Sequence, residues 1–454
     1  MDRLAHVDEG VKQAMQPHLR VAVVGAGWAG LAAGVELAAA GAAVTLFEAA
    51  RQPGGRARSV AVREYVLDNG QHILIGAYRD TLRLMRLVGA DPERLLRRLP
   101  LELAFPGARP RPFRLRLPRL PAPLHLAVGL LAASGVPLAE KLGAARFMRH
   151  LQTSDYRLPA DCTVGELLDR HAQHGALRRH MWEPLCLAAL NTAPRDASAQ
   201  IFANVLRDSL GGGRADTDLL LPAADLDRLF PLPAVEFIRR HGGEIRLSTR
   251  VEQIDDDLSN DGLRIADETF DRIVLATAPQ HAAALLAGHP ATAALGAQLA
   301  TYAYEPIGTV YLAYPPETSL PFPMLGLDAA DGKGLGQWVF DRGALGGPRG
   351  VLGFVLSAHG AWDERDSAAL AAELHVELED ALRRKLPPPL WQQTIRERRA
   401  TFSCRPSLPR PAPRSPRDGL WIAGDYACAD YPATIEGAVR SGIAAARGIL
   451  SETP

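Results

Sequence analysis

The chain contains few cysteines, few lysines and no net charge. Its 51 basic residues balance 51 acidic ones, so no overall field favours nucleic acid. Lysine stands at only four positions, and arginine carries almost all of the positive charge. The four cysteines form no Cys-x-x-Cys pair, which argues against a disulfide framework and makes a reducing cytoplasm the expected compartment. They are Cys162, Cys186, Cys404 and Cys428.

A long hydrophobic run is also missing. No segment reaches the twenty or so apolar residues that a spanning helix needs. Residues 1–20 are polar and carry acids, unlike a signal or transit peptide, and are expected to form an N-terminal extension. The apolar residues 124–133 follow an arginine-rich and proline-rich segment, 100–123. This pattern fits a buried helix of a substrate domain, or a peripheral contact with the inner face of the cell membrane, and both readings stay open. The arginines are Arg109, Arg111, Arg114, Arg116 and Arg119.

A strand, a glycine-rich turn, a helix and a second strand are predicted between residues 21 and 48. Residues 21–24 are a small and β-branched apolar run, and residues 25–30 read Gly-Ala-Gly-Trp-Ala-Gly. Such glycines permit a tight turn and a close approach of the backbone to a pyrophosphate, toward which the helix (about 31–40) points its N-terminal amides. The second strand, 43–47, ends at an acid that can bind a ribose 2′-hydroxyl and repel the 2′-phosphate of NADP. The expected dinucleotide contacts are Gly25, Gly27, Trp28, Ala29, Gly30 and Glu48.

The loop after this unit favours FAD over NAD. Arg51 and the run Gly54-Gly55-Arg56 follow the acid closely. An NAD site has no particular need for such a loop, whereas the longer pyrophosphate and ribityl arm of FAD runs past it. Arg56 can neutralise the pyrophosphate bidentately.

A second half-site is predicted near the end of the sequence. Residues 420–423 read as a short strand leading to Gly424 and Asp425, where a carboxylate can hold the ribityl hydroxyls. The helix predicted over 433–442 would point its N-terminal amides at the pyrimidine edge of the flavin and stabilise negative charge there. Ala433, Thr434 and Ile435 are its expected flavin contacts. One dinucleotide must touch both half-sites, so FAD is the predicted cofactor.

The middle of the chain is expected to return to the cofactor domain. A helix over 234–241 and strands over 244–248 and 250–254 are predicted, followed by an Asp-rich turn over 255–257 and 260–262, part of which lies outside the residues that the structure describes. A short strand over 263–265 and a buried strand within 271–279 are predicted after it. In flavoproteins with this kind of fingerprint a strand in such a position often gives adenine a main-chain contact, and Val251 is the candidate here.

No metal site is predicted. His171 and His174 are three residues apart on a predicted helix, yet arginines surround them and no carboxylate pair joins them. The acidic run 255–257 is placed in a turn rather than on a helix. The sequence also contains no Gly-x-Ser-x-Gly elbow and no second dinucleotide fingerprint, which argues against a built-in NAD(P)H site.

Together the motifs resemble the amine oxidase and carotenoid desaturase flavoprotein superfamily. Within it, residues 67–72 with 76–78, and residues 431–442, resemble the hydroxysqualene dehydroxylases. The resemblance implies an α/β fold in which a Rossmann-type FAD-binding domain is intertwined with a mixed α+β substrate domain. The implied FAD-binding segments are 21–90, 216–280 and 401–454, and the implied substrate segments are 91–215 and 281–400.

The resemblance also implies a reaction, the reductive dehydroxylation of the allylic alcohol hydroxysqualene to squalene in hopanoid biosynthesis. Such a reaction needs an acid to release water, an apolar pocket and a hydride donor. The strand at 66–72 would bring Gly70 to the flavin. The candidates for the proton donor are His72, Gln71, Asp68 and Tyr431.

Three alternatives remain at this stage. A phytoene-type desaturase would carry a more glycine-rich closing segment than residues 431–434. An amine oxidase would usually have a tyrosine just before the Glu-Gly at 436–437, where this chain has Ile435. A non-catalytic FAD scaffold presenting substrate between membrane-bound partners is the third. Contact with the enzymes that make hydroxysqualene is a further expectation.

Overall fold

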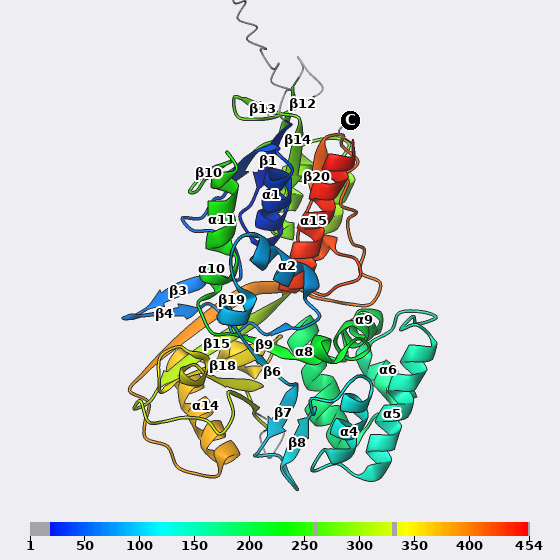
Figure 1. Ribbon diagram of the computed structural model, residues 1–454, viewed down its shortest axis with the longest axis vertical. Coiled ribbons are helices and arrows are strands. Elements are labelled where there is room, and N and C mark those ends of the chain that lie inside the picture. The colour runs from blue at the N-terminus through cyan, green and yellow to red at the C-terminus, as the bar shows by residue number, and fades with distance from the viewer. Residues whose placement is uncertain (1–18, 258–261, 329–333, 453–454) are drawn as a thin grey trace, which may run out of the picture.

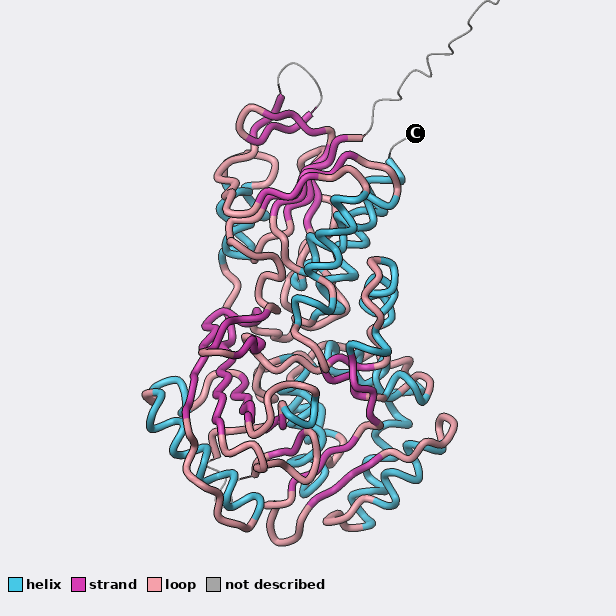
Figure 2. Tube along the Cα trace, turned by 60° about the vertical axis from the view of Figure 1, so that its left-hand side comes forward, coloured by secondary structure: helices cyan, strands magenta, loops and turns pink. Residues whose placement is uncertain are grey.

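The structure, a computed structural model, describes residues 19–257, 262–328 and 334–452. Figure 1 shows two unlike halves stacked along the long axis. One half is a parallel sheet with helices, and the other combines an antiparallel sheet with a group of helices. The turned view of Figure 2 shows helices on both sides of the parallel sheet. The predicted α/β fold with an intertwined α+β part is confirmed.

Five parallel strands form the sheet of the cofactor half, in the order β10-β2-β1-β14-β20. They are β1 (Arg20–Val24), β2 (Ala43–Phe47), β10 (Glu244–Arg246), β14 (Arg272–Leu275) and β20 (Leu420–Ile422). The last residues of four strands lie level with one another, namely Val24, Phe47, Leu275 and Ile422. The segments that follow these strands therefore meet at one edge of the sheet, although they lie up to four hundred residues apart in the sequence.

The helices of this half pack tightly because small residues lie between them. They are α1 (Trp28–Ala39), α2 (Arg79–Leu87), α10 (Leu226–Leu229), α11 (Pro231–Arg240), α12 (Pro279–Ala287), α13 (Ala293–Ala300) and α15 (Ile435–Glu452). A Cβ at Gly442 in α15 would lie 2.1 Å from the carbonyl oxygen of Ala29 in α1. The chain segment after residue 420 is thus part of the cofactor half and not an appendage.

Two predicted elements of this half were wrong. Residues 255–257 form strand β11 (Asp255–Asp257) rather than a turn, and residues 250–254 contain no strand. β11 pairs with β12 (Gly262–Ile265), which pairs with β13 (Glu268–Phe270). The carboxylate of Asp255 lies 3.6 Å from the guanidinium of Arg264 on the opposite strand. Cross-strand pairing of this kind overrides the low intrinsic strand preference of aspartate.

The second half contains an antiparallel sheet in the order β16-β17-β18-β15-β19. Its strands are β15 (Tyr304–Ala313), β16 (Met324–Gly326), β17 (Trp338–Asp341), β18 (Val351–Ser357) and β19 (Trp391–Phe402). Helix α14 (Ser367–Leu382) packs its buried leucines into the same core as the sheet. The Asp366 side chain accepts hydrogen bonds from the backbone amides of Ala368 and Ala369 and so caps this helix.

Smaller elements complete the two halves. The helices are α3 (Pro92–Leu95), α4 (Leu124–Ala132), α5 (Leu138–Thr153), α6 (Val164–Arg170), α7 (Gly175–Leu177), α8 (Glu183–Leu190) and α9 (Ala199–Leu210). The strands are β3 (Ser59–Val62), β4 (Tyr65–Asp68), β5 (Leu74–Ile75), β6 (Leu96–Leu99), β7 (Glu102–Phe105), β8 (Phe113–Arg116) and β9 (Leu219–Pro222). Single helical turns are η1 (Arg178–Trp182), η2 (Arg214–Thr217), η3 (Gly343–Leu345), η4 (Ala361–Glu364) and η5 (Asp425–Ala427). The predicted domain boundaries stay a prediction.

Candidate active site

A cavity of about 1100 Å³ lies where the strand ends of the parallel sheet face the second half. It is slightly larger than the roughly 300–1,000 Å³ of ordinary ligand pockets, as expected for a site that holds a dinucleotide and a second molecule. Both predicted half-sites line it. The predicted residues along its wall are Gly25, Gly27, Trp28, Ala29, Glu48, Arg51, Gly54, Gly55, Arg56, Gly70, Gln71, His72, Val251, Gly424, Asp425, Ala433, Thr434 and Ile435.

The glycine-rich turn leaves room for a ligand on one side only. Gly25 has φ +110°, and a Cβ there would lie 2.7 Å from the carbonyl oxygen of Ala276. Gly30 does not line the cavity, and a Cβ there would lie 1.9 Å from the carbonyl oxygen of Gly25. A Cβ at Gly27 would meet no protein atom within 4 Å. The open side of the turn is therefore at Gly27, next to the first amides of α1, as binding of a pyrophosphate requires.

Two backbone amides hold the carboxylate of Glu48 at the cavity. One oxygen accepts a hydrogen bond from the amide of Ala26 at 2.7 Å, and the other accepts one from the amide of Ala50, also at 2.7 Å. The side chain cannot turn away from the cavity without breaking these bonds. This fixed carboxylate suits the ribose hydroxyls of a dinucleotide.

The Gly-Gly loop packs directly on the turn. The amide of Gly54 donates to the carbonyl of Ala26 at 2.8 Å, and a Cβ at Gly55 would lie 3.1 Å from the Cα of Gly27. Gly55 has φ +62°, a conformation that glycine adopts without strain. The loop thereby brings the next residue, Arg56, to the cavity.

Arg56 joins the two half-sites. Its guanidinium donates to both carboxylate oxygens of Asp425 at 2.9 Å and to the carbonyl of Ala400 at 2.7 Å. The side chain of Asp425 is 7% exposed and that of Arg56 is 34% exposed. Sequence reasoning assigned Arg56 to the pyrophosphate and Asp425 to the ribityl chain, and both assignments stay predictions. The structure adds that the two charges neutralise each other across 369 residues of chain.

The N-terminus of α15 is held beside this pair. Thr434 accepts a hydrogen bond from the amide of Gly437 at 3.1 Å, which satisfies one of the free amides of the first turn. Ser441, one turn further along, accepts from the amide of Gly424 at 2.8 Å. The remaining amides of the first turn are available to a bound ligand.

The segment after β4 contributes two of the predicted proton donors. The Gln71 amide nitrogen donates to the hydroxyl of Tyr311 at 2.7 Å, and its oxygen accepts from Arg342 at 3.3 Å. His72 places Nδ1 3.1 Å from the carbonyl oxygen of Gly70. Burial lowers the pKa of His72 below its usual value, against the opposing effect of that carbonyl. The neutral imidazole therefore dominates at pH 7.

Asp68 lies behind the cavity wall. It is not among the residues lining the cavity, and its carboxylate accepts from the amide of Leu226 at 2.9 Å and lies 3.5 Å from Arg342. Burial raises the pKa of Asp68 to about 6, although the nearby Arg342 lowers it. The expectation that Asp68 gives its proton directly to a substrate does not agree with this position.

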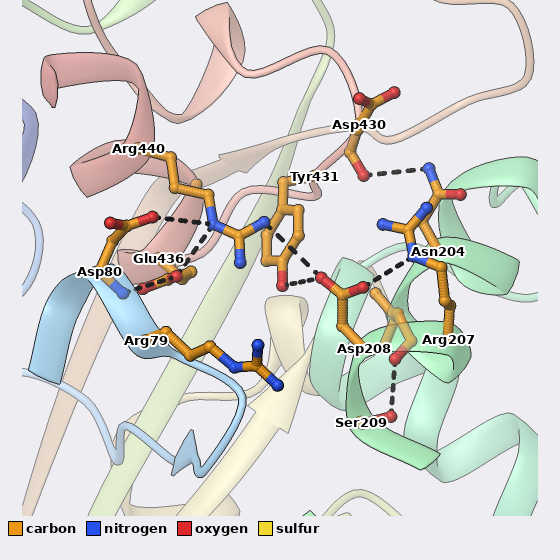
Figure 3. Close-up of polar contacts among 12 residues, drawn as sticks. Arg79, Asp80, Asn204, Arg207, Asp208, Ser209, Asp430, Tyr431, Glu436 and Arg440 are labelled. Atoms are coloured by element: carbon orange, nitrogen blue, oxygen red, sulfur yellow. Dashed lines mark hydrogen bonds and ion pairs between the residues drawn. The ribbon is translucent and has the colours of Figure 1, made fainter. Parts of the chain in front are cut away.

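Tyr431 also lies away from the cavity wall, in a polar contact between the two halves (Figure 3). Its hydroxyl donates to Asp208 of α9 at 2.6 Å, and the guanidinium of Arg440 lies over its ring at 4.2 Å from the centroid. Arg440 in turn lies 3.6 Å from Asp208 and 2.9 Å from Glu436. Tyr431 thus connects α9 to the segment before α15, and its expected place near the isoalloxazine stays a prediction.

Sequence reasoning missed most of the apolar wall. Its residues come from α8, α12 and the antiparallel sheet, and no local motif marks them because they are brought together only by tertiary packing. They are Leu187, Leu285, Ile307, Trp338, Phe340 and Val355. Tyr78 was also missed as a site residue, although it belongs to the segment 76–78 that carried the resemblance. Burial and the charge of Glu436 raise the pKa of Tyr78 well above its ordinary value, so its hydroxyl stays protonated.

The set of donors fits FAD. A turn open at Gly27, a fixed carboxylate, a helix N-terminus and an Arg-Asp pair all lie along one cavity, as binding of a dinucleotide requires. Within the described part of the chain, no three His, Cys, Asp or Glu side chains converge as a metal site would require.

Comparison with known proteins identifies the family. The sequence profile of the family described as flavin containing amine oxidoreductase matches residues 28–450. The chain belongs to this family. It is an FAD-dependent oxidoreductase, and the predicted cofactor is confirmed.

Relatives that match over nearly the whole length are named hydroxysqualene dehydroxylase. The one from Rhodopseudomonas palustris is 30% identical, covering 95% of this chain and 98% of its own. The one from Sinorhizobium fredii is 28% identical, covering 95% and 99%. A zeta-carotene desaturase of Capsicum annuum is 26% identical over only 54% of this chain and 44% of its own.

Solved structures of flavin oxidases share the fold. A redesigned putrescine oxidase aligns with a TM-score of 0.71 at 15% identity, covering 96% of this chain and 99% of its own. Cyclohexylamine oxidase from Brevibacterium oxydans aligns with a TM-score of 0.67 at 19% identity, with the same coverage. At such identities the likeness concerns the fold alone.

Proposed function

We propose that this FAD-dependent oxidoreductase converts hydroxysqualene to squalene and water. The allylic carbon–oxygen bond breaks, the departing hydroxide takes a proton to become water, and the carbon receives a hydride. FAD in its reduced form, held by the residues along the cavity, would supply that hydride. The full-length similarity to hydroxysqualene dehydroxylases supports this proposal over a carotenoid desaturase, whose match covers about half of the chain.

The observation that carries the proposal is the set of apolar residues that line the same cavity as the cofactor-binding residues. Trp338, Phe340 and Val355 of the antiparallel sheet line the cavity, as does Leu187 of α8. A hydrocarbon chain has no group that needs a polar partner, so such a wall is sufficient to bind it and to exclude water. A site that excludes water also protects a reactive allylic centre from side reactions.

The proton comes from a small set of groups in this environment. His72 lies in the cavity wall and has a lowered pKa, so it gives up a proton readily once it is charged. Gln71 is held by Tyr311 and Arg342 and orients the wall rather than exchanging protons. His72 is therefore the preferred donor among the candidates of the sequence.

Anaerobic incubation tests the proposal. The photoreduced holoenzyme is mixed with hydroxysqualene, and flavin reoxidation at its visible band is followed together with squalene by chromatography. Squalene formed in equal amount to reoxidised flavin is expected. Oxidised enzyme is offered phytoene and primary amines in parallel, and flavin reduction by either, with no squalene from hydroxysqualene, would overturn the proposal. Inactivity toward all three would leave the scaffold as the better account.

A matched pair of variants tests the role of the apolar wall. Leu187→Arg places a charge in the cavity and is expected to keep FAD while turnover falls by about 10²-fold or more. Leu232→Arg changes an exposed leucine on α11 and is expected to leave turnover unchanged. Equal activity of the two variants would show that the substrate does not occupy this wall.

A further inference from the structure

An exposed apolar surface lies on α4 and α5. Six of the eleven large hydrophobic side chains exposed in the described part of the chain fall within residues 120–142. Leu124, Leu131 and Leu138 are 56%, 60% and 62% exposed. We call these six residues the α4–α5 apolar surface, and they are Leu120, Leu124, Val128, Leu131, Leu138 and Leu142.

Helical geometry explains why these leucines face outward. In α4, Leu124, Val128 and Leu131 lie within about 60° of one another around the axis, whereas the buried His125 and Gly129 lie on a different arc. A Cβ at Gly129 would lie 2.5 Å from the side chain of Leu117, so α4 is pressed against the segment after β8. The helix therefore has a core face, and a second apolar face that covers nothing in the described part of the chain.

Helix α5 repeats this arrangement. Its buried residues Ala144, Phe147 and Leu151 face the core, and Leu138 and Leu142 lie on the opposite face. Arg149 lies on the same outer face, about 10 Å further along the helix from Leu142. The outer face of α5 thus changes from leucine to arginine along its length.

The sequence around the surface is rich in positive charge, although Glu102 of β7 pairs with Arg114 at 2.8 Å and with Arg116 at 3.5 Å. Between residues 109 and 149 the chain has seven arginines and one lysine but a single acid, Glu140, whose carboxylate accepts from the amide of Leu177. The arginine-rich segment touches α4 and its connection to α5, because Arg114 and Ser134 bond through their backbones and a Cβ at Gly135 would lie 2.6 Å from the carbonyl of Pro112. The basic residues are Arg109, Arg111, Arg114, Arg116, Arg119, Lys141, Arg146 and Arg149.

The position of the α4–α5 apolar surface also fits contact with a membrane. Figure 1 shows α4 and α5 at the end of the molecule away from the parallel sheet and its helices. Within the described residues no helix is long and apolar enough to cross a membrane. Residues 120–139 contain no Asp, Glu, Lys or Arg. Leucines flanked by arginines match a lipid interface, in which acyl chains lie below anionic headgroups.

We propose that the α4–α5 apolar surface docks this protein on a bilayer that carries anionic headgroups. The leucines enter the boundary between headgroups and acyl chains, and the surrounding arginines bind the headgroups. Docking would let a hydrocarbon substrate reach the protein from the bilayer rather than through water. The proposal does not depend on which isoprenoid reacts, because binding is measured without substrate.

Vesicle flotation of the flavin-loaded full chain tests the leucines. Binding to phosphatidylcholine vesicles containing phosphatidylglycerol is expected, with little binding to phosphatidylcholine alone. The triple variant Leu124→Gln/Leu131→Gln/Leu138→Gln should raise the apparent Kd for lipid at least tenfold. The control Leu232→Gln/Leu390→Gln removes leucines that are 48% and 67% exposed elsewhere and should bind as the wild type. An equal loss in both variants, or no loss in the triple variant, would overturn the proposal.

The arginines are tested by charge removal and by salt. Arg111→Gln/Arg119→Gln should weaken binding to anionic vesicles several-fold, whereas Arg239→Gln/Arg240→Gln, which removes two exposed arginines of α11, should not. Raising the salt from about 0.05 to about 0.5 M should weaken the binding of the wild type. Absence of binding at low salt, or equal binding to neutral vesicles, would contradict the proposal.

A second copy of the chain is the rival occupant of this surface. Sedimentation velocity without lipid distinguishes the two. A monomer is expected for both the wild type and the triple leucine variant. A wild-type dimer that the triple variant converts to a monomer would assign the surface to self-association and overturn the membrane proposal. A retained flavin spectrum shows that each variant has folded.

Discussion

Gly27 and Gly30 give the sharpest test of the cofactor site, because a Cβ at Gly27 meets nothing within 4 Å and a Cβ at Gly30 lies 1.9 Å from the carbonyl oxygen of Gly25. An alanine at Gly27 meets no protein atom within 4 Å, and the backbone there (φ −73°, ψ 177°) suits alanine. We expect the unfolding free energy of Gly27→Ala apoprotein to stay within about 0.5 kcal/mol of the wild type. The new methyl group would occupy the space of the pyrophosphate, so the Kd for FAD should rise at least tenfold, which corresponds to about 1.4 kcal/mol.

Gly30→Ala should behave in the opposite way. Its Cβ would lie 1.9 Å from the carbonyl oxygen of Gly25, so α1 must move and the apoprotein should lose on the order of 3 kcal/mol. Urea unfolding of the apoproteins, and quenching of flavin fluorescence on titration, measure the two quantities separately. Wild-type affinity for FAD in Gly27→Ala would refute the assignment of this turn to the pyrophosphate, and unchanged stability of Gly30→Ala would refute the packing argument.

Three further predictions concern the ion pair, the buried acid and the histidine. A double-mutant cycle of Arg56→Met and Asp425→Asn in the apoprotein should give a coupling energy of about 1–3 kcal/mol by urea unfolding, since one partner is buried and the other half-buried. The pKa of Asp68 is raised to about 6, so folding disfavours its ionised form. The stability of the wild type relative to Asp68→Asn should therefore fall by on the order of 3 kcal/mol as the pH rises from about 4 to 7, measured by unfolding across pH. His72→Ala should keep its flavin and lose about 10²-fold in turnover with hydroxysqualene.

The prediction for the Arg56–Asp425 pair has a control pair, and each of the other two predictions has a result that would contradict it. The exposed pair Arg86 and Glu93, 2.6 Å apart, should give a coupling energy of only about 0–1 kcal/mol in the same cycle, and an equal value for the Arg56 pair would contradict its structural role. A difference between wild type and Asp68→Asn that does not change with pH would show that this carboxyl titrates normally. Unchanged turnover in His72→Ala would remove the histidine as proton donor.

The sequence predicted the local parts of the site well. The strand, turn, helix and strand up to Glu48 depend on residues close together in the chain, and the structure shows β1, α1 and β2 within three residues of the expected bounds. The helix that starts at Ile435 was likewise anticipated, although it extends to Glu452 rather than ending at 442. Neighbouring residues decide such elements through their periodicity and their turn chemistry.

What the sequence did not predict depends on distant contacts. No pattern indicates that Arg56 pairs with a carboxylate 369 residues later, or that the hydroxyl of Tyr431 donates to Asp208. The apolar residues of the cavity wall were not predicted for the same reason, because they lie on separate strands and helices. Contact with enzymes that make hydroxysqualene stays a prediction.

The position of β20 in the parallel sheet has a consequence for biosynthesis. This strand pairs with β14 although some 145 residues separate Leu275 from Leu420, and Asp425 follows it directly. A growing polypeptide on the ribosome therefore cannot assemble the cofactor cavity until this late segment has emerged. Until then the edge of β14 that pairs with β20 and the face of α1 that packs on α15 stay uncovered, and uncovered edges and apolar faces of this kind favour aggregation.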